Sequence, residues 1–118
     1  ALGHVIARTI ASHGVDTSHV AWTPEDRVGL YFLEEGKAPR GSQVIYDRKD
    51  SAMAKMQPND LPVDLFQQGN AKLFHTTGIT LAISKSAKAT ATKALELAKN
   101  AGWRVSFDVN YRSKLWTP

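Results

Sequence analysis

Two strand-like runs separated by one long helical segment constrain the fold of this chain more than any other feature. Residues 72–76 and 104–108 favour strands, and a segment rich in alanine and lysine lies between them. Ser84 is a good N-cap for a helix over about 85–100, and Gly102 is a good stop. Two strands joined through a helix form a βαβ unit, with parallel pairing and a right-handed crossover. The sequence therefore predicts an α/β fold.

The second of these strands runs directly into a polar loop. Asp108, Asn110 and Arg112 follow one another at a spacing of two residues. In open α/β sheets, ligands bind just beyond the carboxyl ends of the strands. An ordinary surface loop would carry the same residues, so this pattern alone leaves both interpretations open.

The first half of the chain predicts a helix, a short strand and a hairpin. Apolar residues recur at helical spacing over residues 1–14. A short strand is expected over 19–23. Alternating runs at 28–34 and 43–48 predict a β-hairpin with a long connection. A further short helix is expected over 63–68.

The hairpin concentrates polar groups that suit a small hydroxylated acid. Side chains two apart share a face of a strand, so Tyr46 and Arg48 point the same way. Tyr31 lies on the other strand. Phenols donate to hydroxyls, and arginine engages a carboxylate with two parallel hydrogen bonds. The alternative is that Tyr31 and Tyr46 only pack across the strands and that Arg48 is a solvated charge.

Composition excludes several classes of protein. The 118 residues suit one domain, and the absence of cysteine leaves no disulfide or cysteine–zinc site and fits the cytoplasm. No apolar run approaches the length of a membrane span. The net charge of +4 comes from scattered residues without the basic stripe that nucleic-acid binding requires. The four histidines show no metal-ligand spacing, and we expect no metal site in this chain.

Five short motifs, in this order and spacing, resemble the ribokinase-like (PfkB) carbohydrate kinases. The resemblance covers nearly the whole chain. The motifs are Gly14-Val-Asp-Thr17, Gly29-Leu-Tyr-Phe32, Val44-Ile-Tyr-Asp-Arg-Lys-Asp-Ser-Ala52, Thr77-Gly-Ile-Thr80, and Phe107-Asp-Val-Asn-Tyr-Arg112 with Leu115-Trp116.

The resemblance implies a mostly parallel sheet flanked by helices, with a small β lid that closes over the sugar. Residues 28–48 would form the lid, whereas 1–27 and 49–118 would belong to the α/β core. The substrate-binding residues implied are Tyr31, Tyr46, Asp47, Arg48 and Arg112. The nucleotide-binding residues implied are Asn110, Tyr111 and Arg112, with Asp108 orienting their loop.

The implied activity is ATP-dependent phosphorylation of a sugar acid, with ATP and Mg as cofactors. Members that act on 2-keto-3-deoxygluconate are the most similar, and 5-dehydro-2-deoxygluconate or another sugar is the alternative substrate. A noncatalytic domain that binds sugar acids is the rival from another class. The partners implied are the sugar acid and ATP, without nucleic acid or membrane. The resemblance is also compatible with a homo-oligomer.

Both ends of the chain predict an internal piece of a longer protein. The family's Gly-Gly substrate motif would precede Ala1, and its Gly-Ala-Gly-Asp motif with the catalytic base would follow Pro118. No catalytic residue is therefore expected within these 118 residues, and we expect them to lack kinase activity on their own.

Overall fold

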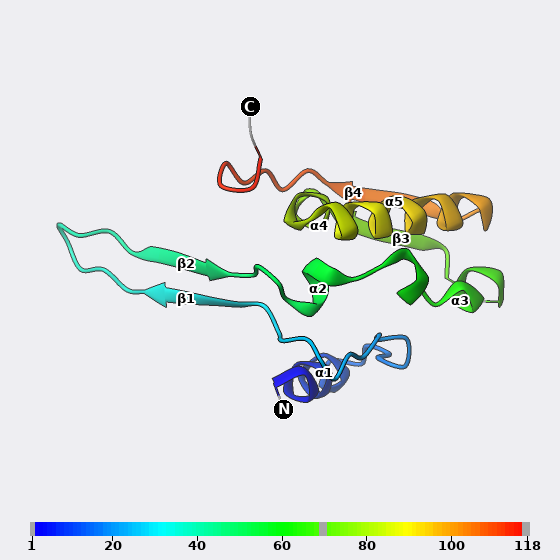
Figure 1. Ribbon diagram of the computed structural model, residues 1–118, viewed down its shortest axis with the longest axis horizontal. Helices are drawn as coiled ribbons and strands as arrows, with labels where there is room; N and C mark the ends of the chain where they lie inside the picture. The colour runs from blue at the N-terminus through cyan, green and yellow to red at the C-terminus, as the bar shows by residue number, and fades with distance from the viewer. Residues whose placement is uncertain (1, 69–70, 117–118) are drawn as a thin grey trace. The chain divides into compact units, whose positions relative to one another are not determined.

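The computed structural model describes residues 2–68 and 71–116, and the chain divides into two compact units between Met53 and Ala54. The first unit contains helix α1 (Leu2–Ser12) and strands β1 (Leu30–Glu34) and β2 (Gln43–Asp47) (Figure 1). Strand β3 (Leu73–Thr77) and strand β4 (Arg104–Asp108) lie in the second unit. The remaining elements are α2 (Ala52–Lys55), the 3-10 turn η1 (Pro58–Asp60), α3 (Val63–Gln68), α4 (Gly78–Ile83) and α5 (Lys85–Asn100).

Helix α1 confirms the helix predicted for the start of the chain. Gly14 follows it with φ of +78°, a left-handed conformation that ends helices and that glycine adopts without a steric penalty. The short strand predicted over 19–23 is wrong. A strand needs a neighbour to take its backbone hydrogen bonds, and this segment pairs with none of the described strands. Trp22 instead stacks on His4, with ring centres 4.5 Å apart.

The hairpin predicted in the first unit is present. Strands β1 and β2 pair antiparallel, with Tyr31 opposite Tyr46 and Leu33 opposite Val44. Residues directly opposite each other project from the same face, so these four side chains share one face. Phe32 and Ile45, also opposite each other, project from the other face. The assignment of this hairpin as a lid on a core formed by 1–27 and 49–118 stays a prediction.

The second unit contains the predicted βαβ arrangement. Strands β3 and β4 pair in parallel, with Leu73 opposite Arg104 and Thr77 opposite Asp108. Helix α5 packs on both strands, and Figure 1 shows it running beside them. The crossover holds one more helix than the sequence predicted, because α4 begins directly at the end of β3.

Small residues explain how closely α5 packs. Its buried positions are all alanine or threonine, at the three- and four-residue steps that form one face of a helix: Ala87, Thr90, Ala91, Ala94 and Ala98. A face without long side chains lets the helix backbone approach its neighbours. At its C-terminal end, Phe66 packs against Ala94 and Ala98, and stacks on Trp103 with ring centres 5.0 Å apart. This cluster is the apolar core of the second unit.

Ser84 caps α5 as the sequence predicted. Its hydroxyl oxygen accepts a hydrogen bond from the Ala87 N–H at 2.9 Å and donates one to the Ala54 carbonyl oxygen. Ser84 therefore satisfies one of the backbone N–H groups that every helix leaves unpaired at its start, and it also ties α5 to the segment before η1.

Removal of the Ser84 hydroxyl is expected to destabilise the fold. We expect Ser84→Ala to lower the free energy of unfolding by about 1 to 2 kcal/mol, because the cap and the bond to Ala54 are both lost. Chemical denaturation measures this change. Ser113→Ala is the matched control, since Ser113 is exposed and makes no side-chain hydrogen bond within the described part of the chain. Equal stability of the two variants would contradict the capping role.

Among the helices that the structure describes, none combines the length and the apolar character of a membrane span.

Candidate functional site

One face of the hairpin gathers three of the residues singled out by the sequence. The Tyr31 and Tyr46 rings lie 6.4 Å apart across the strand pair, tilted by 46°. The Arg48 guanidinium carbon lies 4.3 Å from the centre of the Tyr46 ring, where the electron-rich face attracts a cation. Tyr31 is 66% exposed and Tyr46 is 45% exposed, so both phenols are open to a ligand. The cross-strand packing that the sequence allowed is therefore present, and it leaves the polar groups accessible.

Arg48 differs from two neighbouring arginines in its electrostatic surroundings. Arg27 pairs with Asp47 at 2.6 Å, and Arg40 pairs with Glu34 at 3.0 Å. Within the described part of the chain, no carboxylate pairs with Arg48. Its guanidinium keeps the planar set of donors that matches a carboxylate. The hairpin face thus offers a positive charge that lies over an aromatic ring and has no carboxylate partner among the described residues.

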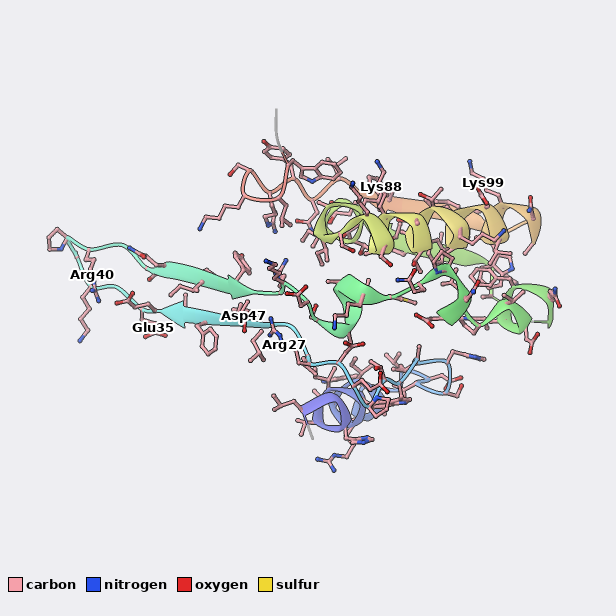
Figure 2. All side chains as sticks on the ribbon, in the orientation of Figure 1. Arg27, Glu35, Arg40, Asp47, Lys88 and Lys99 are labelled. Atoms are coloured by element: carbon pink, nitrogen blue, oxygen red, sulfur yellow. The ribbon has the colours of Figure 1, made fainter. Side chains whose placement is uncertain are left out.

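Asp47 projects away from this face because side chains alternate along a strand. Its carboxylate accepts two hydrogen bonds from Arg27, Nη1 to Oδ2 at 2.9 Å and Nη2 to Oδ1 at 2.6 Å. Figure 2 shows the pair near the end of the hairpin that joins the rest of the first unit. Sequence reasoning missed Arg27. The only local signal was a basic residue just before a predicted strand, and its partner lies 20 residues away.

The second unit holds the other predicted group of residues at the carboxyl ends of β3 and β4. Thr77 and Asp108 end the two strands side by side. Asp108 Oδ1 accepts a hydrogen bond from the Asn110 N–H at 2.9 Å, and Asn110 has φ of +41°. This bond supports the expectation that Asp108 orients the loop, since an aspartate that bonds two residues ahead forms a compact turn.

Tyr111 and Arg112 follow in the same loop and are exposed. Arg112 Nη1 donates to the Tyr111 carbonyl oxygen at 3.0 Å, and the described residues include no carboxylate partner for Arg112. The Arg112 carbonyl oxygen accepts from Leu115 N–H at 2.8 Å and Trp116 N–H at 3.1 Å, which closes the chain into a turn. A second guanidinium therefore lies beyond a strand end, where α/β folds bind ligands.

Gly78 is a second residue whose importance sequence reasoning missed. It is the first residue of α4 and is buried. A Cβ atom at this position would lie 2.2 Å from the Val109 carbonyl oxygen and 3.2 Å from its carbon. Glycine is thus the residue that lets α4 approach the loop carrying Asn110 and Arg112. The motif Thr77-Gly-Ile-Thr80 contained this glycine, but the contact depends on the register of two strands 31 residues apart.

Titratable groups elsewhere in the described chain form no group of three or more that could hold a metal ion. His75 Nδ1 lies 3.0 Å from Ser106 Oγ across β3 and β4, and His4 stacks on Trp22. The Asp16 carboxylate accepts a hydrogen bond from the Ser18 N–H at 2.8 Å, which lowers the pKa of Asp16. Asp16 lies in the turn after α1, outside both predicted groups of site residues.

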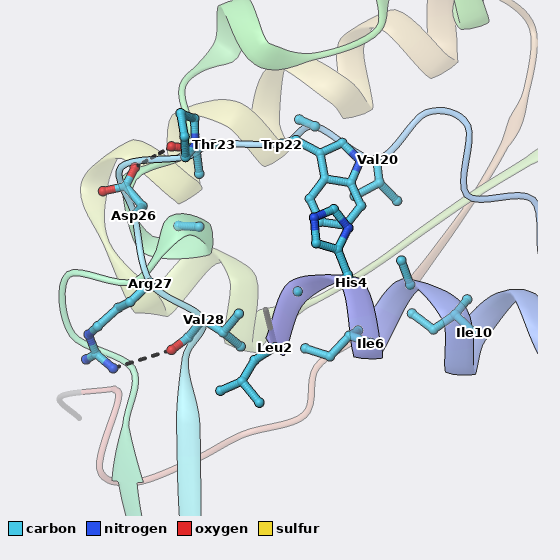
Figure 3. Close-up of a pocket in the computed structure, with 15 residues that line it drawn as sticks. Leu2, His4, Ile6, Ile10, Val20, Trp22, Thr23, Asp26, Arg27 and Val28 are labelled. Carbon is cyan, nitrogen blue, oxygen red and sulfur yellow. Dashed lines mark hydrogen bonds between the residues drawn. The ribbon is translucent and has the colours of Figure 1, made fainter.

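The first unit also has an open apolar cavity of about 620 Å³ between α1 and the segment from Val20 to Val28 (Figure 3). Leu2, Ile6 and Ile10 line it from the helix. The Trp22 ring, stacked on His4, lies on the opposite side. None of the predicted binding residues lines this cavity, so it does not belong to the proposed site.

Comparison with known proteins agrees with the motif resemblance. Residues 1–118 match the family described as pfkB family carbohydrate kinase. A 2-dehydro-3-deoxygalactonokinase from Haloferax volcanii is 42% identical over 99% of this chain and 36% of its own length. A 2-dehydro-3-deoxygluconokinase from Thermoproteus tenax is 39% identical over 97% of this chain and 34% of its own length. This chain therefore spans about a third of the length of these relatives.

A solved structure gives the same result for the fold. The crystal structure of 2-dehydro-3-deoxygluconokinase from Thermotoga maritima matches 98% of this chain and 35% of its own chain, with a TM-score of 0.87 and 38% identity. The α/β fold class predicted from the sequence is confirmed by this likeness. The chain belongs to the pfkB family of carbohydrate kinases.

Proposed function

We propose that the complete protein carrying this chain transfers the γ-phosphate of ATP to a hydroxyl of 2-keto-3-deoxygluconate. The observation that carries this proposal is Arg48, a guanidinium held over Tyr46 without a carboxylate partner among the described residues. A neutral sugar offers this guanidinium only uncharged acceptors, whereas a sugar acid supplies a carboxylate that forms a charged, two-pronged pair. Sugar kinase activity agrees with the family to which the chain belongs.

Each predicted residue has a proposed role. Arg48 binds the carboxylate of the acid, and the phenols of Tyr31 and Tyr46 donate to its hydroxyls. Asp47 contributes through its main chain, because its carboxylate is occupied by Arg27. Arg112 reaches the substrate from the loop after β4.

The nucleotide is proposed to lie against the same loop. Asn110 and Tyr111 provide an amide and a phenol beside the Arg112 guanidinium, and such groups suit phosphate oxygens. ATP and Mg are the cofactors that we propose for the complete protein. The roles that we propose for this chain are substrate binding and exclusion of water.

The hairpin is proposed to act as a lid. Closure over the bound acid would remove water from the site and favour transfer to the sugar over hydrolysis of ATP. We assign no catalytic base within this chain. ATP-dependent metabolism of a sugar acid also favours the cytoplasm as the location.

A second candidate substrate is 2-keto-3-deoxygalactonate, favoured by the 42% identity to the 2-dehydro-3-deoxygalactonokinase. The two acids share a carboxylate and differ in one hydroxyl configuration, so the same arginine would serve both. 5-Dehydro-2-deoxygluconate is a third candidate, since a 5-dehydro-2-deoxygluconokinase from Geobacillus thermodenitrificans is 36% identical to this chain over 116 residues.

A substrate panel on the complete protein tests the proposal. We expect kcat/KM for 2-keto-3-deoxygluconate to exceed that for fructose by on the order of 10²-fold or more, because fructose leaves Arg48 unpaired. ADP release coupled to sugar phosphorylation measures each rate. A preference for fructose would contradict a carboxylate-binding role for Arg48. Tight binding of the acid without ADP release would favour a noncatalytic binding domain.

A further inference from the structure

Arg27 lies just before β1, at the end of the hairpin that joins the rest of the first unit, and its side chain contacts the end of β2 and the segment after it. Its guanidinium donates to the Asp47 carboxylate at 2.6 and 2.9 Å and to the Asp47 carbonyl oxygen at 3.3 Å. It also donates to the Val28 carbonyl oxygen at 3.4 Å and to the Lys49 carbonyl oxygen. Figure 3 shows the bond to Val28, and Figure 2 shows Arg27 facing Asp47. The Arg27 side chain thus ties the segment entering β1, to which Arg27 belongs, to the end of β2 and the segment leaving it.

The main chain of Arg27 also bonds the segment after β2, so both its side chain and its main chain act at the base of the hairpin, here called the junction. Its carbonyl oxygen accepts a hydrogen bond from the Ala52 N–H at 2.8 Å, and Arg27 forms a parallel bridge with Ser51. Ser51 is only 2% exposed, and its N–H donates to the Arg48 carbonyl oxygen at 3.3 Å. The junction is therefore closed by the side chain and by the main chain of the same residue.

Asp47, the residue that Arg27 binds, lies between two residues of the proposed acid site. Asp47 separates Tyr46 from Arg48, and its side chain points to the opposite face of the strand. Because Arg27 holds both the carboxylate and the carbonyl oxygen of Asp47, it fixes the Asp47 side chain and the peptide plane between Asp47 and Arg48. Arg27 can therefore set the direction of the Tyr46 and Arg48 side chains, which flank Asp47, without touching the substrate.

We propose that Arg27 is a positioning residue for the Tyr46–Arg48 pair, an inference that rests on the proposed sugar-acid function. A role in stability alone is a weak explanation. The two side chains are 41% and 48% exposed, and exposed ion pairs contribute little to stability. The Arg27 guanidinium bonds five acceptor atoms, four of which belong to Asp47 and Lys49 across the hairpin, and a simple surface pair does not need so many.

The test compares Arg27→Ala with Arg40→Ala in the complete protein. Arg40 is the matched control, because it also forms an ion pair in the hairpin but contacts Glu34, at the far end of the strands. We expect Arg27→Ala to raise KM for the acid about tenfold, since small displacements of binding groups are costly. KM for ATP should stay within about twofold, and Arg40→Ala should leave both values within about twofold.

Two further variants keep the test decisive if Arg27→Ala folds poorly. Arg27→Lys keeps the charge but cannot form the two-pronged contact, so it should also raise KM for the acid with an unchanged melting temperature. Asp47→Asn should also raise KM for the acid. In the double variant Arg27→Lys/Asp47→Asn, the rise in this KM should be much smaller than the product of the two single rises.

An active wild-type enzyme whose acid KM is unchanged in Arg27→Ala, Arg27→Lys and Asp47→Asn would overturn the inference. A wild-type enzyme inactive on every sugar acid would instead overturn the proposed function. These two failures are distinguishable, because the wild type is measured first.

Discussion

Arg48→Ala is expected to raise KM for the sugar acid by about a hundredfold in the complete protein, the loss expected when one partner of a desolvated charge pair is removed. The Arg48 guanidinium is the positive group on the hairpin face that carries Tyr31 and Tyr46, here called the phenol face. Alanine at this position leaves the substrate carboxylate without its charged donors. KM for ATP should change less than about twofold, because uniform loss of acid binding leaves the nucleotide contacts in place. Steady-state kinetics with each substrate varied in turn measures both values.

A graded series separates charge from geometry at this position. Arg48→Lys keeps a positive charge but loses the planar fork, so we expect an acid KM between those of the wild type and Arg48→Ala. Arg40→Ala again serves as the control, since its partner is Glu34 and it lies outside the phenol face. An acid KM that is the same for the wild type and Arg48→Ala would mean that Arg48 is a solvated surface charge, and the acid assignment would then lose its main support.

The elements predicted most accurately are those whose signals are local. The helix over 85–100 has an N-cap at one end and a glycine at the other, and α5 occupies those residues. Helix α3 likewise coincides with the predicted 63–68. Caps and stops act within one turn of the chain, so a sequence contains all the information that they need.

The wrong and missing elements depend on distant partners. The strand predicted over 19–23 is wrong, because the local sequence cannot supply the neighbouring strand that would pair with it. The β-branched residues after Thr77 concealed α4, whose first residue packs against Val109, 31 residues further along the chain. Intrinsic propensity is a weak prior, and tertiary contacts override it in a helix as short as this one.

The candidate site shows the same division. Two-residue periodicity was enough to place Tyr46 and Arg48 on one face of a strand. The alignment of Tyr31 with Tyr46 needed the register of the hairpin, and the connection over 35–42 is too long for a turn type to fix that register. Arg27 was missed for the same reason, since its importance comes from acceptors up to 22 residues away.

Substitution of Gly78 is the second change for which we expect a large effect. Alanine is a better helix former than glycine by about 1 kcal/mol, so propensity alone predicts that Gly78→Ala stabilises α4. The added Cβ would lie 2.2 Å from the Val109 carbonyl oxygen, a separation at which the two atoms overlap. We expect the overlap to prevail and to lower the free energy of unfolding by about 1 to 3 kcal/mol, the usual cost of overpacking. Chemical denaturation gives the sign directly.

The same overlap should also lower kcat/KM for ATP in the proposed reaction. Both atoms that would approach the new Cβ most closely belong to the Val109 backbone, so relief of the contact must move the chain that continues into Asn110 and Arg112. We expect Gly78→Val to reduce kcat/KM for ATP more than Gly78→Ala does, because its larger side chain needs a larger displacement. Gly41→Ala is the control, since a Cβ there would meet no atom within 4 Å. If Gly78→Ala were as stable as Gly41→Ala and bound ATP equally well, the loop after β4 would have to tolerate displacement, and a fixed Arg112 could not be part of the site.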